Sequence, residues 1–196
     1  MKFLKALIIE LANFFIFLIT FCPGKTGVFL RKSFLKIMFK ELGKNFYSEI
    51  GLFITGHKNI TIRNNCRFMR HSSINADENS SIKIGNNISV NYNVNINSCN
   101  NGYIEIGDNV MIGQNTVLRA SDHIPKDRNE KINNQSHTGG KIIIGNNVWI
   151  GANCVILKNV KIEDNSVIGA GTIVSRNVKK NEVIVGNQQR ILKTNV

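Results

Sequence analysis

The stretch from Ile142 to Val174 reads IIIGNNVWIGANCVILKNVKIEDNSVIGAGTIV, and it decides the fold. An aliphatic residue returns at every sixth position, at Ile144, Ile150, Ile156, Ile162, Ile168 and Val174. A helical face repeats about every 3.6 residues and an ordinary strand about every 2, so a sustained period of six fits neither. It fits a three-sided coil, in which each hexapeptide forms one flat side and one corner and the aliphatic side chain points inward.

The same pattern extends toward the N-terminus, because one six-residue phrase occurs five times. Its copies begin at Ile60, Ile82, Ile104, Ile142 and Val160. A regular coil of three hexapeptides has 18 residues, so the spacings of 22 indicate extra residues at a corner and the spacing of 38 indicates a larger excursion. The sequence therefore predicts a mainly β protein, a parallel β-helix of hexapeptide repeats whose stacked coils bury ladders of Ile and Val.

Length and charge limit the rest of the interpretation. The chain has 196 residues, enough for one domain with an appendage, and 25 Lys+Arg against 13 Asp+Glu give a formal net charge of +12. The basic residues concentrate near both ends, which favours polyanionic partners such as phosphates or anionic lipid. Nucleic acid is not an expected partner, because no aromatic stacking motif is interleaved with the basic residues.

The first 50 residues lack the repeat and are predicted to form a helical arm, followed by a β-helix domain over residues 51–192. Phe3 to Cys22 is strongly apolar, but Glu10 interrupts it, so a secretory signal is not expected and a membrane-spanning helix is marginal. After Pro23-Gly24, basic residues alternate with apolar ones at roughly helical spacing. The apolar residues are Phe29, Leu30, Phe34, Leu35, Met38, Phe39 and Leu42.

Such a basic amphipathic helix can lie on an anionic membrane surface. The alternative is that both helices pack on the β-helix or on a neighbouring subunit. The four cysteines, Cys22, Cys66, Cys99 and Cys154, have no CxxC spacing, so we expect reduced thiols, most of them buried, rather than a zinc cluster or a disulfide framework.

Two motifs carry a resemblance to a known family. They are Ile144-Gly-Asn-Asn-Val-Trp-Ile-Gly-Ala and Asn165-Ser-Val-Ile-Gly-Ala-Gly-Thr-Ile-Val. With them, residues 54 to 192 resemble the hexapeptide-repeat acyltransferases, in particular the branch of maltose, galactoside and polysaccharide O-acetyltransferases. The resemblance implies a left-handed coil, a homotrimer, and transfer of an acetyl group from acetyl-CoA to a sugar hydroxyl, with no metal required. The N-terminal helices followed by Leu42-Gly-Lys-Asn resemble membrane-proximal members that act on O-antigen or capsule.

The excursion over residues 119–140 carries the candidate base. Transfer to an alcohol needs a base that works near neutral pH, and histidine suits that role. The resemblance places the catalytic histidine at His123, in Ser121-Asp-His-Ile-Pro-Lys-Asp. His137, in Ser136-His-Thr-Gly-Gly, is the alternative base, and Asp122 is a candidate to orient His123.

The resemblance also implies binding residues. Asn93 and Asn115 would lie near the acceptor. The alternative for each is a corner residue of the coil, and for Asn93 neither interpretation is favoured. The residues implied for acetyl-CoA are Trp149, Ala152, Ala170, Ser175, Arg176 and Arg190. The phrase Gly186-Asn-Gln-Gln-Arg lacks the proline that the family normally carries there, which weakens the detailed cofactor prediction.

Three other functions stay open at this point. A β-helix carbonic anhydrase would hold zinc with three histidines, and the four histidines here show no paired spacing. A non-catalytic β-helix would bind without turnover. A transferase could also use a small acceptor such as serine, an amino sugar or an antibiotic. For the main interpretation we expect a cytoplasmic protein, with peripheral contact to the inner face of the cytoplasmic membrane as one option.

Overall fold

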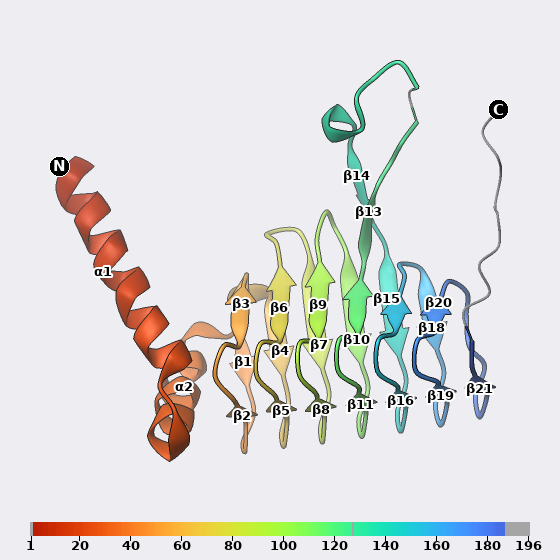
Figure 1. The fold of residues 1–196 in the computed structure, drawn as a ribbon, viewed down its shortest axis with the longest axis horizontal. Coiled ribbons are helices and arrows are strands. Elements are labelled where there is room, and N and C mark those ends of the chain that lie inside the picture. Colours follow the sequence, from red (N-terminus) through yellow and green to blue (C-terminus); the bar gives the residue numbers. More distant parts are fainter. Residues whose placement is uncertain (1, 127, 187–196) are drawn as a thin grey trace.

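The computed structural model describes residues 2–126 and 128–186, and these form a three-sided parallel β-helix with two helices at its N-terminal end (Figure 1). Face A consists of β1 (Glu41–Leu42), β4 (Ile60–Ile62), β7 (Ser81–Ile84), β10 (Tyr103–Ile106), β15 (Lys141–Ile144) and β18 (Val160–Ile162). Face B consists of β2 (Tyr47–Ser48), β5 (Arg67–Phe68), β8 (Ser89–Val90), β11 (Met111–Ile112), β16 (Trp149–Ile150), β19 (Val167–Ile168) and β21 (Val183–Ile184). Face C consists of β3 (Phe53–Thr55), β6 (Ser73–Ala76), β9 (Asn95–Ser98), β12 (Val117–Arg119), β17 (Val155–Ile156) and β20 (Ile173–Val174).

Each residue pairs with its equivalent in the next coil. Ile104, for example, pairs with Ile82 on one side and with Ile142 on the other. The sixth-position residues Ile150 and Ile156 are fully buried in one shared core. The prediction of a parallel β-helix is thereby confirmed, and the arrangement is consistent with the left-handed form.

Asparagine forms the corner between faces A and B, which we call the A–B corner. The residues Asn45, Asn65, Asn87, Asn109, Asn147, Asn165 and Asn181 all have positive φ angles, from 54° to 65°. Asparagine tolerates this left-handed backbone better than most residues. The side-chain amides also bond between coils, since Asn65 donates to Asn87 over 2.9 Å and Asn87 donates to Asn109 over 3.0 Å. Corner geometry and corner hydrogen bonding therefore explain the abundance of Asn.

The corner between faces C and A, the C–A corner, carries the excursion. The chain leaves the coil after the buried Ala120 and forms an antiparallel hairpin of β13 (Ser121–His123) and β14 (His137–Gly139), with the short 3-10 helix η2 (Ile132–Asn134) between them. The hairpin stands out from the column (Figure 1). The expected protruding loop is thus a paired ribbon at its base.

Two helices precede the column, α1 (Lys2–Phe21) and α2 (Gly24–Met38). The column begins at Glu41, ten residues before the predicted boundary at 51, because β1 pairs with β4 and Phe46 is buried in the core. Leu42, which the helical spacing included, therefore lies in a strand. The 3-10 helix η1 (His57–Asn59) turns the next C–A corner. In the described residues no helix is long and apolar enough to cross a membrane.

One buried guanidinium joins both helices to the first coil. Arg31 of α2 donates two hydrogen bonds to the carbonyl oxygen of Ser48, at 3.2 and 3.1 Å. Its Nη1 donates to the carbonyl oxygens of Cys22 at 2.7 Å and Ile19 at 3.3 Å, at the end of α1. Carbonyls at a helix C-terminus lack partners within the helix, so Arg31 satisfies them while fixing α1 to the column.

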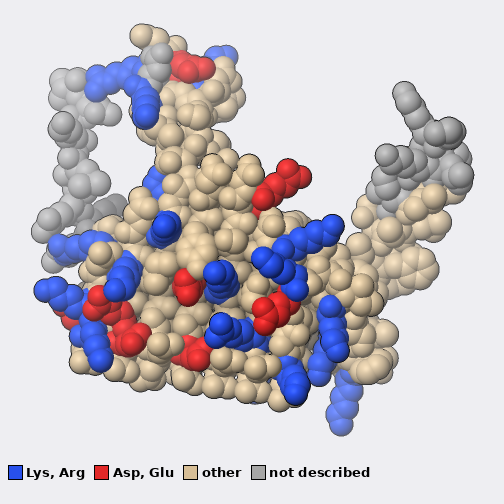
Figure 2. All heavy atoms as spheres, turned by 180° about the vertical axis from the view of Figure 1, so that it is seen from behind, with Lys and Arg blue, Asp and Glu red and all other residues tan. Residues whose placement is uncertain are grey.

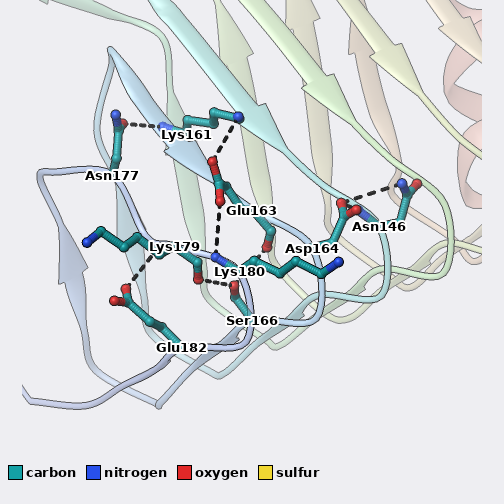
Figure 3. A network of polar contacts seen from close by, with 9 residues as sticks. All are labelled: Asn146, Lys161, Glu163, Asp164, Ser166, Asn177, Lys179, Lys180 and Glu182. Carbon is teal, nitrogen blue, oxygen red and sulfur yellow. Dashed lines mark hydrogen bonds and ion pairs between the residues drawn. The ribbon is translucent and has the colours of Figure 1, made fainter.

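A polar network holds the last coils together (Figure 3). The carboxylate of Glu163 accepts from the side chain of Lys161 at 3.0 Å and from the backbone N–H of Lys180 at 3.1 Å. These hydrogen bonds, with that of Lys161 the largest cause, lower the pKa of Glu163. Ser166 donates to the carbonyl oxygen of Lys179 at 2.9 Å. Side-chain bonds thus supplement the short strand pairing at this end.

All four cysteines are free thiols. Cys66 and Cys154 are buried, whereas Cys22 and Cys99 are half-buried. Burial raises the pKa of the Cys66 thiol to about 11. Two of the four cysteines are therefore core residues, fewer than the majority predicted.

The corner ladder gives a test of the fold. Replacing Asn87 with alanine removes its amide bonds and places a residue that disfavours positive φ at the corner, so we expect a loss of about 1–3 kcal/mol in the free energy of unfolding. Asn87→Gly keeps the backbone angle and should lose only about 1 kcal/mol. Urea unfolding followed by circular dichroism measures both. Equal losses for the two variants would contradict a backbone role for this asparagine.

Candidate functional site

Two histidines lie side by side on the projecting hairpin. The N–H of Ile124 donates to the carbonyl oxygen of Ser136 at 2.9 Å, so the adjacent pair, His123 and His137, is a non-hydrogen-bonded pair of the antiparallel ladder. Side chains approach most closely at such pairs. The two imidazole ring centroids are 3.7 Å apart, with the ring planes at 46°. The structure thus joins the predicted base and the alternative base into one cluster.

The carboxylate of Asp122, the residue next to His123, points away from the two histidines. A side-chain oxygen of Asp122 lies 3.4 Å from Nζ of Lys158, which follows β17 in the next coil. Successive side chains of a strand point to opposite faces, so Asp122 and His123 lie on opposite faces of the ribbon. Asp122 therefore pairs with Lys158 and does not orient His123.

Packing at the base of the hairpin shows the direction of the ribbon face that carries His123 and His137, which we call the histidine face. Gly139 shares this ribbon face with the two histidines, being two residues from His137. A Cβ atom at Gly139 would lie 2.1 Å from the carbonyl oxygen of Asn100 and 2.6 Å from the nitrogen of Gly102. The histidine face is therefore turned toward the preceding coil, away from the last coils of the same chain.

Both imidazoles are exposed to solvent. A neutral imidazole can accept a proton through one ring nitrogen while the other donates, which is the chemistry of a general base. In residues 2–126 and 128–186, no three His, Cys, Asp or Glu side chains cluster closely enough to hold a metal ion.

The predicted acceptor residues lie at a different corner, the B–C corner between faces B and C. Asn93 donates to Asn115 at 3.0 Å, and Asn115 donates to Asn153 at 3.1 Å. Asn93 and Asn115 both have positive φ angles. Each therefore acts as a corner residue of an asparagine ladder, and a contact with an acceptor stays a prediction.

The same corner carries the predicted cofactor alanines. Ala152 and Ala170 occupy equivalent positions in successive coils, and Ala170 is exposed. Glycine precedes each alanine, and a Cβ atom at Gly151 would lie 2.6 Å from the backbone nitrogen of Ala170. Small residues therefore line this edge, where the backbones of successive coils pack closely.

The remaining predicted residues are spread over the last coils. Trp149 lies on face B, 53% exposed, paired with Met111 and Val167 in the neighbouring strands. Ser175 and Arg176 follow β20 and are exposed near the C–A corner. Arg190 lies outside the described residues. No single corner of one chain thus combines the histidine pair with Ala152 and Ala170.

Sequence reasoning did not identify the contact between the two histidines. It could have been found by counting inward from Ala120 and Gly140, the residues at which the chain leaves and re-enters the coil. The structure also shows an apolar outer surface on the later strands of faces B and C, around Trp149. Its members are Met111, Trp149, Val167 and Val183 on face B, and Val117, Val155 and Ile173 on face C.

Known proteins share both the repeat and the fold. The family model described as bacterial transferase hexapeptide (six repeats) matches residues 141–176. The crystal structure of a maltose O-acetyltransferase from Clostridium difficile 630 is 29% identical, with a TM-score of 0.63, and the match covers 90% of this chain and 80% of that chain. No curated protein matches the sequence.

Two further structures extend the comparison. AntD, an N-acyltransferase from Bacillus cereus solved with dTDP and 3-hydroxybutyryl-CoA, is 22% identical, with a TM-score of 0.65 and coverage of 80% of this chain and 83% of that chain; at this identity it supports the fold alone. A galactoside acetyltransferase in complex with coenzyme A is 30% identical, with a TM-score of 0.58 and coverage of 87% of this chain and 72% of that chain. The chain belongs to the hexapeptide-repeat acetyltransferase family.

Proposed function

We propose that this enzyme transfers the acetyl group of acetyl-CoA to a hydroxyl group of a sugar in a cell-surface glycan or its precursor, with His123 as the general base. The observation that carries the proposal is an exposed histidine on a hairpin that projects from a hexapeptide column. Two similar structures, a maltose O-acetyltransferase and a galactoside acetyltransferase with bound coenzyme A, support a sugar acceptor and a CoA donor.

The proposed reaction needs no covalent enzyme intermediate. The acceptor hydroxyl oxygen attacks the thioester carbonyl carbon of acetyl-CoA as His123 takes the hydroxyl proton. The bond from carbon to sulfur then breaks, and the proton passes from the imidazolium to the leaving thiolate. The products are an acetyl ester and free CoA, so one base and a ternary complex are sufficient.

The B–C corner is the proposed path of the CoA arm. The arm is long and flexible, so it suits an extended backbone edge with small side chains, and Ala152 and Ala170 provide such an edge. Trp149 lies beside this edge on face B, and Arg176 is an exposed cation of the last coils. Cations are suited to the phosphates at the nucleotide end of CoA.

We further propose that a second copy completes the site. His123 and the alanine edge lie at different corners, and the histidine face of the hairpin turns away from the chain's own last coils. The outward apolar side chains of faces B and C, among them Met111 at 55% and Ile173 at 45% exposure, form a surface typical of a protein interface. The family resemblance implies a homotrimer, which would bring one chain's hairpin beside another chain's edge.

The function can be tested with an acceptor screen. Purified protein is incubated with acetyl-CoA and sugars, amino sugars or serine, and free thiol is measured. We expect turnover with a sugar hydroxyl, and His123→Ala should lower kcat by at least about a hundredfold because the base is lost.

His71→Asn is the matched control. His71 is also exposed but sits at the B–C corner with a positive φ, where other coils carry Asn93 and Asn115, so the variant should keep full turnover. An unchanged rate for His123→Ala would remove His123 from the mechanism, and turnover with amines alone would replace the sugar hydroxyl as acceptor.

We also propose that the enzyme is cytoplasmic and that its N-terminal helices, α1 and α2, hold it on an anionic membrane surface. Leu7, Leu11, Phe14, Leu18 and Phe21 are spaced by three or four residues on α1 and are 44% to 57% exposed. A 20-residue helix is about 30 Å long, so this is an extended apolar stripe.

The C-terminal end of α1 is the part that packs on the rest of the chain, where Ile19 and Thr20 are half-buried. Ile16 and Ile19 line a pocket shared with Phe34, Leu35 and other residues of α2 and the first coil. The described part of α1 shows few charged side chains in Figure 2, while Lys and Arg lie at its foot. The exposed basic residues of and next to α2 are Lys25, Lys32, Lys36 and Lys40. An apolar stripe beside such cations suits the interface of an anionic bilayer.

The membrane proposal predicts a loss of vesicle binding on changing the stripe. The variant Leu11→Ser, Phe14→Ser and Leu18→Ser should no longer sediment with vesicles that contain anionic lipid, because the apolar area is removed. Ile132→Ser changes an exposed apolar residue of the excursion and should bind as wild type. Undiminished binding of the triple variant, or self-association through α1 without any vesicle binding, would contradict the proposal.

A further inference from the structure

We infer that His137 is a positioning residue for His123, holding its imidazole in the orientation that proton transfer requires. This inference rests on the proposed function, because it assumes that His123 is the base. It adds a residue that the family motifs do not place in the reaction and that sequence reasoning treated only as a rival base.

The first support is the register of the hairpin. The bonded pairs of the ladder are Ile124 with Ser136 and Ala120 with Gly140, which makes His123 and His137 direct partners without mutual backbone bonds. At this type of pair the Cβ atoms are closest, so two rings must either stack or turn apart. Here the centroids are 3.7 Å apart, so the rings are in contact.

The second support is the direction of the carboxylate next to His123. A catalytic histidine is commonly oriented by a neighbouring acid. Asp122, the adjacent acid, lies on the other face and contacts Lys158 at 3.4 Å. Ring contact from His137 supplies the orientation by a different means, since it restricts rotation of the His123 side chain about its own bonds.

The third support is the anchored base of the ribbon. Ser121 is fully buried, and the Gly139 backbone packs against Asn100 and Gly102 so tightly that a side chain there would clash. The histidine pair lies two residues beyond these anchors. His137 is therefore itself held in place, as a residue that positions another side chain must be, although both rings are exposed to solvent.

The test separates orientation from folding and from base chemistry. His137→Ala should lower kcat by about three- to tenfold, the range expected for losing one aromatic contact, with little change in KM for acetyl-CoA or in the melting temperature. His137→Phe retains a ring but no titrating group, and it should restore most of the lost kcat. Thr138→Ala, on the opposite ribbon face, and Asp122→Asn are the controls and should keep wild-type kcat.

A spectroscopic readout follows the ring itself. In protein labelled with 13C-histidine, the ring signal of His123, assigned by its absence in His123→Ala, should shift in His137→Ala and stay near its wild-type position in His137→Phe. A hairpin that is only destabilised would lower the melting temperature without this selective rescue.

The outcomes distinguish this inference from the proposed function. If wild type turns over, His123→Ala is inactive and His137→Ala equals wild type, the positioning role is wrong and the base stands. If His137→Ala and His137→Phe are both inactive while His123→Ala is active, His137 is the base and both assignments fail. If His137→Ala does not fold, the His137→Phe variant decides. A wild-type kcat with an unshifted His123 ring signal supports the positioning role. A tenfold loss of kcat in His137→Phe overturns it.

Discussion

Vertical pairing of equivalent residues is the constraint on which the rest of the structure depends. Strand residues pair in register with the residues at the same position of the neighbouring coils, so each side chain repeats its environment along the column. Aliphatic residues such as Ile104 therefore stack inward in continuous ladders, and asparagines such as Asn87 stack at corners where the backbone turns left-handed. A coil tolerates extra residues only at a corner, because insertion within a side would shift all of these ladders.

This constraint also fixes the chemistry in space. The hairpin leaves and re-enters the coil at adjacent corner positions, Ala120 and Gly140, so the core is undisturbed and two histidines are carried out into solvent. The small residues of the last coils, including Ala152 and Ala170, stack at another corner for the same reason. One chain thus presents a candidate base and a candidate cofactor edge on separate corners, which explains why assembly is part of the proposed mechanism.

The period of six predicts the inward residues from Ile60 to Val174 because burial in a narrow prism leaves them no alternative. The first coil was not predicted from the sequence, because Leu42 and Phe46 stand where later coils carry the Ile phrase. The apolar spacing also continues the helical pattern past Phe39, although α2 ends at Met38. Asn93 and Asn115 show the limit of motif transfer, because a corner asparagine and a binding asparagine look alike in sequence. The contact of His123 with His137 depends on strand pairing inside the excursion, which hydrophobic periodicity does not report.

Complementation between two inactive variants tests most directly whether the site is shared between copies. Subunits carrying His123→Ala are co-expressed with subunits carrying Ala170→Trp, each variant bearing a different tag, and assemblies containing both are purified. If the hairpin of one chain serves the edge of another in a cyclic trimer, each mixed assembly has one of its three sites intact. The purified mixed assemblies should then show about a third of the wild-type turnover, although each variant alone is inactive. Mixed assemblies that remain inactive would contradict the account, because they would mean that base and cofactor edge must come from the same chain.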